Sequence, residues 1–516
     1  MQMKKVSQES SPLLSLVKDT LRLKKQALVF CNTKRGAEKA AEDCAKKIKE
    51  TTPEQLAEKI LGILASPTKQ CRRLARSIEK GMAFHHAGLH QKQREIIEDA
   101  FREGNIKIIC STPTLAAGVD LPAFRTILRD VKRFGRRGLQ YIPVLEYLQM
   151  AGRSGRPKYD KKGEAIMIAA SEGDREELIE RYVKGVPEPI LSKLAVEPVL
   201  RTYLLSLIAS RMVRNRSQLL AFFEKTFWAH QYEDFFRLEQ KIDSMVALLA
   251  EWGMIQEEGE DTDFVSADRL QDHGLRATPV GKRVAELYLD PLTAYLLIQR
   301  MRRTSQRKVA DFSWLQMVSH TLEMAPLLRV RVKDQEMIED ALVQYDGSLL
   351  DLEPTMYDFE YQEFQNSIKT ALFLLDWISE KDEEYLLETY GIRPGEIKVK
   401  LDLADWLLYA SGELGRILGF LPLLKDLQRM RVRLKYGVKE ELLSLLRFRG
   451  IGRVRARKLH DNRIRTVADV KHAELGKLMA LIGKAAARSL KTQVGENIPE
   501  EVKTNKRKGQ INLKDY

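Results

Sequence analysis

The chain has 516 residues, 44% of them hydrophobic, so it can bury several cores, and we expect three or four domains. It has no apolar run of 18 residues and no apolar segment near its first residues, which argues against membrane insertion and secretion and favours a cytoplasmic location. With 86 Lys and Arg against 72 Asp and Glu, the net charge of +14 fits a polyanionic partner.

Short β-rich runs alternate with helical patterns in the first part of the chain. The β-rich runs occupy residues 27–33, 81–87, 106–112, 124–131 and 163–170. This alternation predicts a parallel sheet covered by helices, hence an α/β domain over residues 1–185. The cysteines form no CxxC pair, so we expect buried thiols and neither a metal site nor a disulfide framework. They are Cys31, Cys44, Cys71 and Cys110.

From Pro187 onward the strand signals nearly vanish and long amphipathic helical patterns follow, so the remainder is expected to be mostly α-helical. Turns at Asp290-Pro291, Arg393-Pro394-Gly395 and Leu421-Pro422 mark boundaries between helices. We predict a winged-helix domain over 186–289, a helical domain over 290–428, a third helical domain over 429–497 and a mobile basic tail over 498–516.

The strongest chemical signal is the segment 149–157, read together with 111–120 upstream. Arg153 and Arg156 lie three residues apart, and neighbouring glycines permit close backbone approach. Two guanidinium groups so placed can make bidentate contacts with phosphate oxygens, whereas the plain alternative is two surface arginines in a turn. The whole set of segments favours arginine-finger chemistry.

Several segments resemble the motifs of superfamily-two helicases. Residues 149–157 resemble motif VI, 111–123 resemble motif V, and 28–38 resemble motif IV, while 85–89 fit the segment between motifs IV and V. The resemblance implies that residues 20–185 form the second RecA-like motor domain of an ATP-driven helicase.

The resemblance also implies roles for individual residues around the nucleotide. Arg153 and Arg156 would reach across a cleft to the β- and γ-phosphates of ATP. Gln149 would help to place the nucleotide or the attacking water, and Gly152 would lie beside the nucleotide. Gly118 and Asp120 would couple the nucleotide state to strand contact.

Three polar residues would hold the DNA backbone by the same resemblance. Asn32, Thr33 and Thr112 would contact phosphate or sugar, which positions a strand without reading its sequence.

No GxxxxGK[ST] loop and no DExH or DExD box follows any strand. We therefore expect ATP and Mg²⁺ to be held mostly by a first motor domain outside this chain, either through truncation or in a split motor, and no ATP hydrolysis by the chain alone.

A segment between motifs V and VI, residues 129–146, is longer than a motor needs. Glycines at 135 and 138 suit a hairpin turn, and Phe134 and Tyr141 could stack at a duplex junction. Similar segments in Ski-type and HELQ-type helicases form the β-hairpin that splits base pairs. An ordinary surface hairpin is the alternative.

The helical part is similar to the ratchet domain of archaeal HELQ-type repair helicases, through residues 368–380, 390–397 and 404–409. In that family an aromatic residue on a long helix stacks on a base of the single strand. The resemblance makes Trp406 the candidate, with Lys398 two turns earlier on the helix. Core packing of Trp406 is the alternative.

Residues 442–459 match a helix-hairpin-helix motif. Gly450 and Gly452 would let backbone N–H groups at the start of the second helix face a phosphate, and Arg453 and Arg455 would add positive charge. A purely structural hairpin is the alternative.

The final residues resemble a sliding-clamp-binding peptide, with Gln510, an aliphatic residue at Leu513 and an aromatic residue at Tyr516. A solvated tail is the alternative. Together these resemblances imply part of an ATP-dependent 3′ to 5′ DNA helicase that acts on forked or repair-associated DNA. Two rivals remain, a Ski-type RNA helicase and a non-catalytic DNA-binding subunit.

Overall fold

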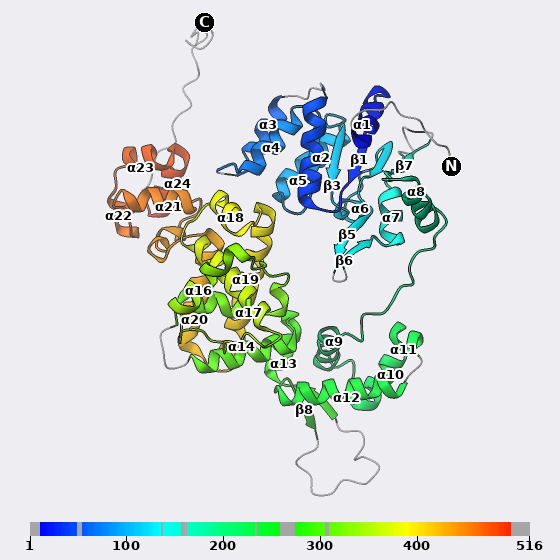
Figure 1. The fold of residues 1–516 in the computed structure, drawn as a ribbon. Helices are drawn as coiled ribbons and strands as arrows, with labels where there is room; N and C mark the ends of the chain where they lie inside the picture. Colours follow the sequence, from blue (N-terminus) through cyan, green and yellow to red (C-terminus); the bar gives the residue numbers. More distant parts are fainter. Residues whose placement is uncertain are drawn as a thin grey trace.

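The computed structural model describes residues 11–48, 54–64, 66–135, 138–155, 160, 162–232, 235–258, 274–304 and 309–496. An α/β domain comes first, and mostly helical domains follow it (Figure 1). The predicted fold class is confirmed at this level. No helix in the described ranges is long and apolar enough to cross a membrane.

A five-stranded parallel sheet forms the centre of the α/β domain, with strand order β2-β3-β1-β4-β7. The strands are β1 (Ala27–Phe30), β2 (Met82–His85), β3 (Ile108–Ser111), β4 (Arg125–Leu128) and β7 (Glu164–Met167). Every residue of β1 to β4 is buried, as expected of parallel strands covered by helices on both faces.

Helices surround this sheet and share its core. They are α1 (Pro12–Arg22), α2 (Lys34–Lys47), α3 (Glu54–Leu61), α4 (Lys69–Ile78), α5 (Gln91–Arg102), α6 (Thr114–Gly118), α7 (Val144–Ala151), α8 (Glu172–Leu178) and the π-helix η1 (Ile179–Val183). The buried guanidinium of Arg125 ties α1 to the sheet, since it pairs with Asp19 at 2.9 Å and with Glu164 at 2.6 Å. All four cysteines are buried, which confirms their prediction as buried thiols.

An antiparallel hairpin projects from the α/β domain between β4 and α7. It consists of β5 (Lys132–Gly135) and β6 (Gly138–Tyr141), with Phe134 opposite Leu139. Gly138 has a φ of +89°, a conformation that favours glycine.

The segment 184–196 contains no helix or strand and leads to the helical domains. The first group comprises α9 (Glu197–Ala209), α10 (Arg216–Glu224), α11 (Phe227–Tyr232), α12 (Phe235–Glu251), the antiparallel pair β8 (Ile255–Glu258) and β9 (Gly274–Ala277), and α13 (Pro279–Leu287). The second comprises α14 (Pro291–Arg303), α15 (Asp311–Ser319), η3 (Leu322–Met324), η4 (Val332–Asp334), α16 (Gln335–Gln344), α17 (Tyr361–Ile378), α18 (Glu383–Tyr390), α19 (Pro394–Ile417) and α20 (Leu421–Tyr436).

One continuous hydrophobic core joins these two groups, extending from Leu200 to Leu434. A buried, bidentate ion pair reinforces the junction, because Arg201 of α9 donates two hydrogen bonds of 2.6 Å to Asp290, the N-cap residue of α14. The two groups therefore form one packed body, although the turn at Asp290-Pro291 does end one helix and begin the next.

The last described part has a core of its own. Its helices are η5 (Glu440–Leu442), η6 (Leu445–Arg447), α21 (Arg453–Asp461), α22 (Val467–His472), α23 (Leu475–Ile482) and α24 (Lys484–Gln493).

Candidate nucleotide and nucleic-acid site

The carboxyl ends of β1, β2 and β3 lie side by side at one edge of the sheet, because these three parallel strands are neighbours. After these ends the chain continues through Asn32, His86 and Thr112, respectively. Ligands of open α/β sheets bind outside the carboxyl ends of the strands, so this edge is the candidate site.

Asn32 and Thr33 occupy the edge next to the hairpin. The Asn32 side-chain amide donates to the carbonyl oxygen of Lys132, the first residue of β5, at 2.6 Å. Thr33 is exposed and caps α2, since its hydroxyl accepts from the N–H of Gly36 at 2.9 Å. Asn32 thus anchors the hairpin, while the free face of Thr33 is open to a ligand.

Thr112 is buried, and its hydroxyl oxygen lies 3.0 Å from that of Thr114. Thr114 begins α6 and is exposed. At this strand end the exposed residue is therefore Thr114, which the sequence reasoning did not single out.

The loops that resemble motifs V and VI are joined to one another. The N–H of Ala123 donates to the carbonyl of Arg153 at 2.9 Å, and the N–H of Gly155 donates to the carbonyl of Ala123 at 2.6 Å. The Arg153 side chain donates to the carbonyl of Ala116 at 2.9 Å and lies 3.6 Å from Asp120. These bonds join the two loops into a single unit. A ligand bound to one loop would therefore affect the position of the other.

Three of the candidate nucleotide residues lie on the two helices next to these loops, α6 and α7. Gln149 is exposed on α7, and Gly152 ends that helix. Gly118 is exposed at the end of α6, with no atom within 4 Å of the position that a Cβ would take. Arg156 lies outside the described residues.

An arginine at such an exposed loop fits one side of a nucleotide site. Arg153 keeps 24% of its side chain exposed, so its guanidinium can reach a phosphate after releasing Ala116. Among the described residues, no group of three or more His, Cys, Asp or Glu is placed to hold a metal ion. The described chain thus fits an arginine contact to phosphate.

The two hairpin aromatics differ in their surroundings. Phe134 is 85% exposed on β5. The Tyr141 hydroxyl donates to Glu177 at 2.6 Å, and the cations of Lys132 and Arg181 lie 4.3 and 4.4 Å from its ring. Phe134 is therefore available for stacking, whereas Tyr141 is held in a polar cluster.

Lys398 and Trp406 both lie on α19, as the sequence predicts. Lys398 is exposed, pairs with Asp402 at 2.5 Å and lines a cavity of about 1110 Å³ between α19, α20 and the last domain. Trp406 is partly buried and packs against the helical core. Trp406 therefore has a packing role, and its exposed part is what a base could contact.

The turn at Gly450 and Gly452 precedes α21. Gly450 has a φ of +80°, and Gly452 is the N-cap residue of α21, with open space beside both. Arg455 donates to the carbonyl of Gly450 at 2.6 Å, whereas Arg453 donates to the carbonyl of Lys381 at 2.9 Å. The guanidinium of Arg453 also lies 5.4 Å from the ring of Trp377, so Arg453 joins this domain to the preceding one.

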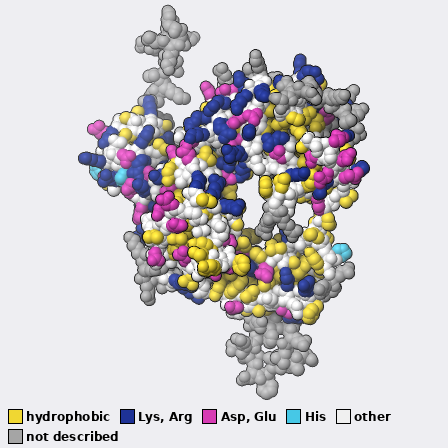
Figure 2. Space-filling model, in the orientation of Figure 1, with side chains coloured by type: hydrophobic (Ala, Val, Ile, Leu, Met, Phe, Trp, Pro, Cys, Tyr) yellow, Lys and Arg dark blue, Asp and Glu magenta, His cyan; other side chains and the backbone are white. Residues whose placement is uncertain are grey.

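Positive charge gathers over α2, α3 and α4, where Lys and Arg side chains cover much of the visible face (Figure 2). A surface of this kind attracts polyanions at long range.

The clamp-like residues Gln510, Leu513 and Tyr516 lie outside the described residues.

Two family models match the chain. Residues 11–158 match the helicase conserved C-terminal domain, and residues 312–437 match the archaeal helicase domain 4. The first match covers the α/β domain up to the motif VI segment, and the second covers α15 to α20.

Curated relatives match nearly the whole chain. An ATP-dependent DNA helicase Hel308 from Methanocella arvoryzae is 38% identical over 94% of this chain, and one from Pyrobaculum calidifontis is 35% identical over 96% of it. A third, from Pyrococcus horikoshii, is 36% identical over 91%. The chain spans 65% of the length of the Methanocella protein and 68% of that of the Pyrobaculum protein.

Proposed function

Since this chain belongs to the Hel308 family of archaeal superfamily-two DNA helicases, we propose that it supplies the second motor domain and the strand-handling domains of an ATP-dependent DNA helicase. The observation that carries the proposal is the Arg153 side chain, which donates to the carbonyl of Ala116 on α6, the helix that follows the carboxyl end of β3. In this proposal the nucleotide contact and the strand contact belong to one unit.

In this proposal the side chains of the chain perform three tasks at the nucleotide. Arg153 and Arg156 contact the phosphates across a cleft, Gln149 orients the nucleotide or water, and Asp120 links that contact to the strand. Bound ATP with Mg²⁺, held mainly by a first motor domain, supplies the free energy. Arginine contacts of this kind stabilise the charge that develops during phosphoryl transfer.

The strand-handling part follows the order of the domains. The strand lies along the carboxyl edge at Thr33 and Thr114, and Phe134 at the hairpin meets the duplex junction. We assign the winged-helix role to α9 to α13, the ratchet role to the body around α19, and the helix-hairpin-helix role to the Gly450-Gly452 turn. Direction (3′ to 5′), action on forked DNA and the closer likeness to HELQ-type repair helicases belong to the same proposal.

The names of the relatives favour DNA over RNA as the substrate, so the Ski-type RNA alternative is not carried further. A non-catalytic DNA-binding subunit would share the DNA contacts and lack the arginine function. Measuring whether a first motor domain restores ATP turnover therefore distinguishes a helicase motor from a non-catalytic DNA-binding subunit.

The strand contact is tested by titrating a labelled single strand into the chain at rising salt. We expect the affinity to fall with a log-log slope of about −0.7 per phosphate neutralised. Lys398→Gln should weaken binding and lower this slope. Lys184→Gln is the matched control, because Lys184 is also exposed and also pairs with a carboxylate four residues away. Affinity that is independent of salt would contradict a nucleic-acid role.

A further inference from the structure

The N-terminus of α19 is seated on the α/β domain. The N–H of Gly395, in the first turn of α19, donates to the carbonyl oxygen of Gly88 at 3.1 Å. First-turn N–H groups have no acceptor within their own helix, so they need an outside partner. Here that partner is the turn 86–89 that follows β2.

Neither glycine at this contact leaves room for a side chain. A Cβ on Gly395 would lie 2.3 Å from the carbonyl oxygens of Ala87 and Leu89. A Cβ on Gly88 would lie 2.4 Å from Cδ of Arg393. At Gly395 the backbones approach so closely that any larger residue would push the helix away from the turn, whereas at Gly88 the side chain of Arg393 would have to move.

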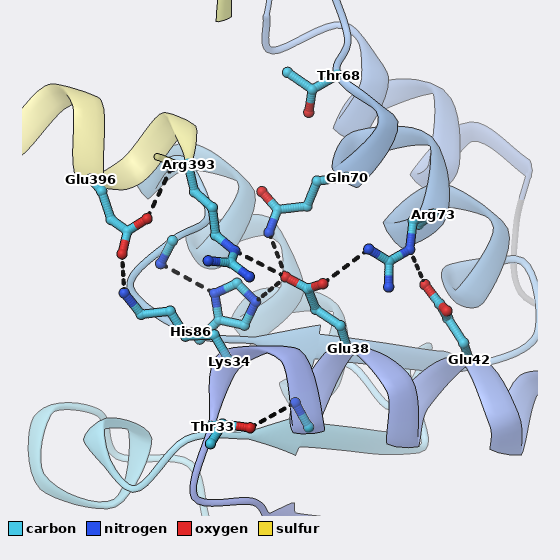
Figure 3. A network of polar contacts seen from close by, with 12 residues as sticks. Thr33, Lys34, Glu38, Glu42, Thr68, Gln70, Arg73, His86, Arg393 and Glu396 are labelled. Atoms are coloured by element: carbon cyan, nitrogen blue, oxygen red, sulfur yellow. Dashed lines mark hydrogen bonds and ion pairs between the residues drawn. The ribbon is translucent and has the colours of Figure 1, made fainter. Parts of the chain in front are cut away.

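A buried carboxylate joins the two sides (Figure 3). Glu38 of α2 accepts hydrogen bonds from Gln70 at 2.8 Å, from His86 Nε2 at 3.2 Å and from Arg393 Nε at 3.2 Å. Arg393 is the N-cap residue of α19, whereas the other three belong to the α/β domain. Although burial opposes the charged form, the hydrogen bonds to Glu38 and the charge of Arg393 lower its pKa to about 2.

His86 is fixed in one orientation within this network. It is fully buried, and its Nδ1 accepts from the N–H of Gly88 at 3.1 Å. Since Nδ1 is an acceptor, Nε2 carries the proton that is donated to Glu38. The neutral ring therefore connects the turn, the carboxylate and, through that carboxylate, Arg393.

A second link runs from α19 to the strand-contact edge. Lys34, the first residue of α2, forms an ion pair with Glu396. The other oxygen of Glu396 accepts from the N–H of Arg393 at 2.9 Å, which completes a capping box. Lys34 directly follows Thr33, so the residue that holds α19 adjoins the candidate strand contact.

The contact is a second connection between the α/β domain and the helical body. The chain connects the α/β domain to the helical body through 184–196, which has no helix or strand. Ion pairs between Lys69 of α4 and Glu384 and Glu388 of α18 lie at the rim of the same contact. The two bodies are thus connected by the segment 184–196 at one place and by a tight contact at another.

We propose that residues 86–89, Glu38 and Lys34 form a joint with residues 393–396 that fixes the helical body relative to the α/β domain. On the proposed function, on which this consequence rests, the strand contacts at Asn32 and Thr33 and the exposed part of Trp406 then move as one unit. Trp406 lies about 18 Å along α19 from its start at 1.5 Å per residue, so loosening the joint enough to let α19 tilt by about 10° would displace Trp406 by about 3 Å relative to the strand contacts. That is about the rise of one nucleotide along a single strand of a duplex, 3.4 Å.

The joint is tested by measuring a distance between the two bodies in the full chain, without nucleotide or DNA. All four natural cysteines are buried, so thiols introduced on exposed residues can be spin-labelled selectively. We place them with Lys39→Cys on α2 and Lys425→Cys on α20, both exposed. Double electron–electron resonance then reports the distribution of distances between them.

We expect a narrow distribution in the parent, and a broadened distribution shifted to longer distance in Gly395→Ala. Gly412→Ala is the matched control, because it lies on the same helix and its Cβ would meet no atom within 4 Å. That control should reproduce the parent. Arg393→Met, which removes only the guanidinium, provides a second variant if Gly395→Ala does not fold, and it should also broaden the distribution.

A broad distribution in the parent would overturn the joint, and so would variants that superimpose on the parent while circular dichroism shows the same helix content. Because no DNA enters this experiment, its result is independent of the salt-dependent titration that tests the proposed function. A chain that binds DNA but lacks a fixed distance would refute the joint alone.

Discussion

The side-chain amide of Asn32 donates a 2.6 Å hydrogen bond to the carbonyl oxygen of Lys132, which connects the end of β1 to the first residue of the hairpin. We predict that Asn32→Asp, which keeps the size but removes the donor, destabilises the hairpin by about 1 kcal/mol. Faster amide hydrogen exchange in β5 and β6 would show this. Unchanged exchange there would mean that the hairpin is held by its other contacts.

The buried pair of Arg201 and Asp290 should be essential for the shared helical core. Arg201→Met leaves a buried carboxylate without its partner, so we expect a loss of about 3 to 5 kcal/mol in the unfolding free energy of the helical body. Urea unfolding followed by helical circular dichroism measures it. The double variant Arg201→Met, Asp290→Leu should recover part of the loss, and equal stability of the single variant and the parent would refute the prediction.

Stability should depend on pH through Glu38. Its pKa is lowered from 4.5 to about 2 in the folded chain, so its carboxylate stabilises the fold fully above pH 4.5, and this contribution is lost as the pH falls towards 2. The difference in urea midpoint between the parent and Glu38→Gln should therefore shrink as the pH falls from 4.5 to 3. A difference that does not change with pH would mean that ionisation of Glu38 does not contribute to stability.

Burial lowers the pKa of His86, so the neutral ring is the favoured form in the fold. Below its ordinary value of 6.5 the unfolded chain takes up a proton before the folded chain does, and stability falls as the pH falls. His86→Gln should lose less stability than the parent between pH 7 and 5. An identical loss in both would show that His86 does not titrate differently on unfolding.

The aromatic residues at the hairpin and on α19 should respond differently to substitution. Phe134→Ala should leave the melting temperature unchanged, because the side chain is 85% exposed, and should lower unwinding in the assembled helicase. Trp406→Leu keeps much of the apolar packing but removes the aromatic ring, so a loss of about 1 to 3 kcal/mol in single-strand affinity without a lower melting temperature would indicate stacking on a base. Loss of melting temperature alone would assign Trp406 to the core.

The alternating pattern of the first 185 residues was sufficient to predict the parallel sheet, since strands buried on both faces are continuous apolar runs such as Ala27–Phe30. The motif segments located the loops at Arg153 and Asp120, which the structure brings within 3.6 Å of each other. These features are local, or rest on a resemblance of whole motifs.

Long-range contacts were beyond the reach of such patterns. Glu38 and Arg393 are 355 residues apart, and nothing in the sequence around either residue indicates that they meet. Arg453 was expected beside a phosphate, yet its guanidinium packs on Trp377, because basicity alone does not specify a partner. A pattern of turns also does not predict the single core from α9 to α20.

The most direct test of the proposed function joins the chain to the first motor domain of a Hel308 relative and measures ATP turnover with and without single-stranded DNA. We predict DNA-stimulated turnover that falls by about 10³-fold or more in Arg156→Ala, the scale of arginine-finger losses, with little change in DNA affinity. Near-normal turnover in Arg156→Ala, or no stimulation by DNA in the parent, would contradict the assignment of this chain as the second motor domain.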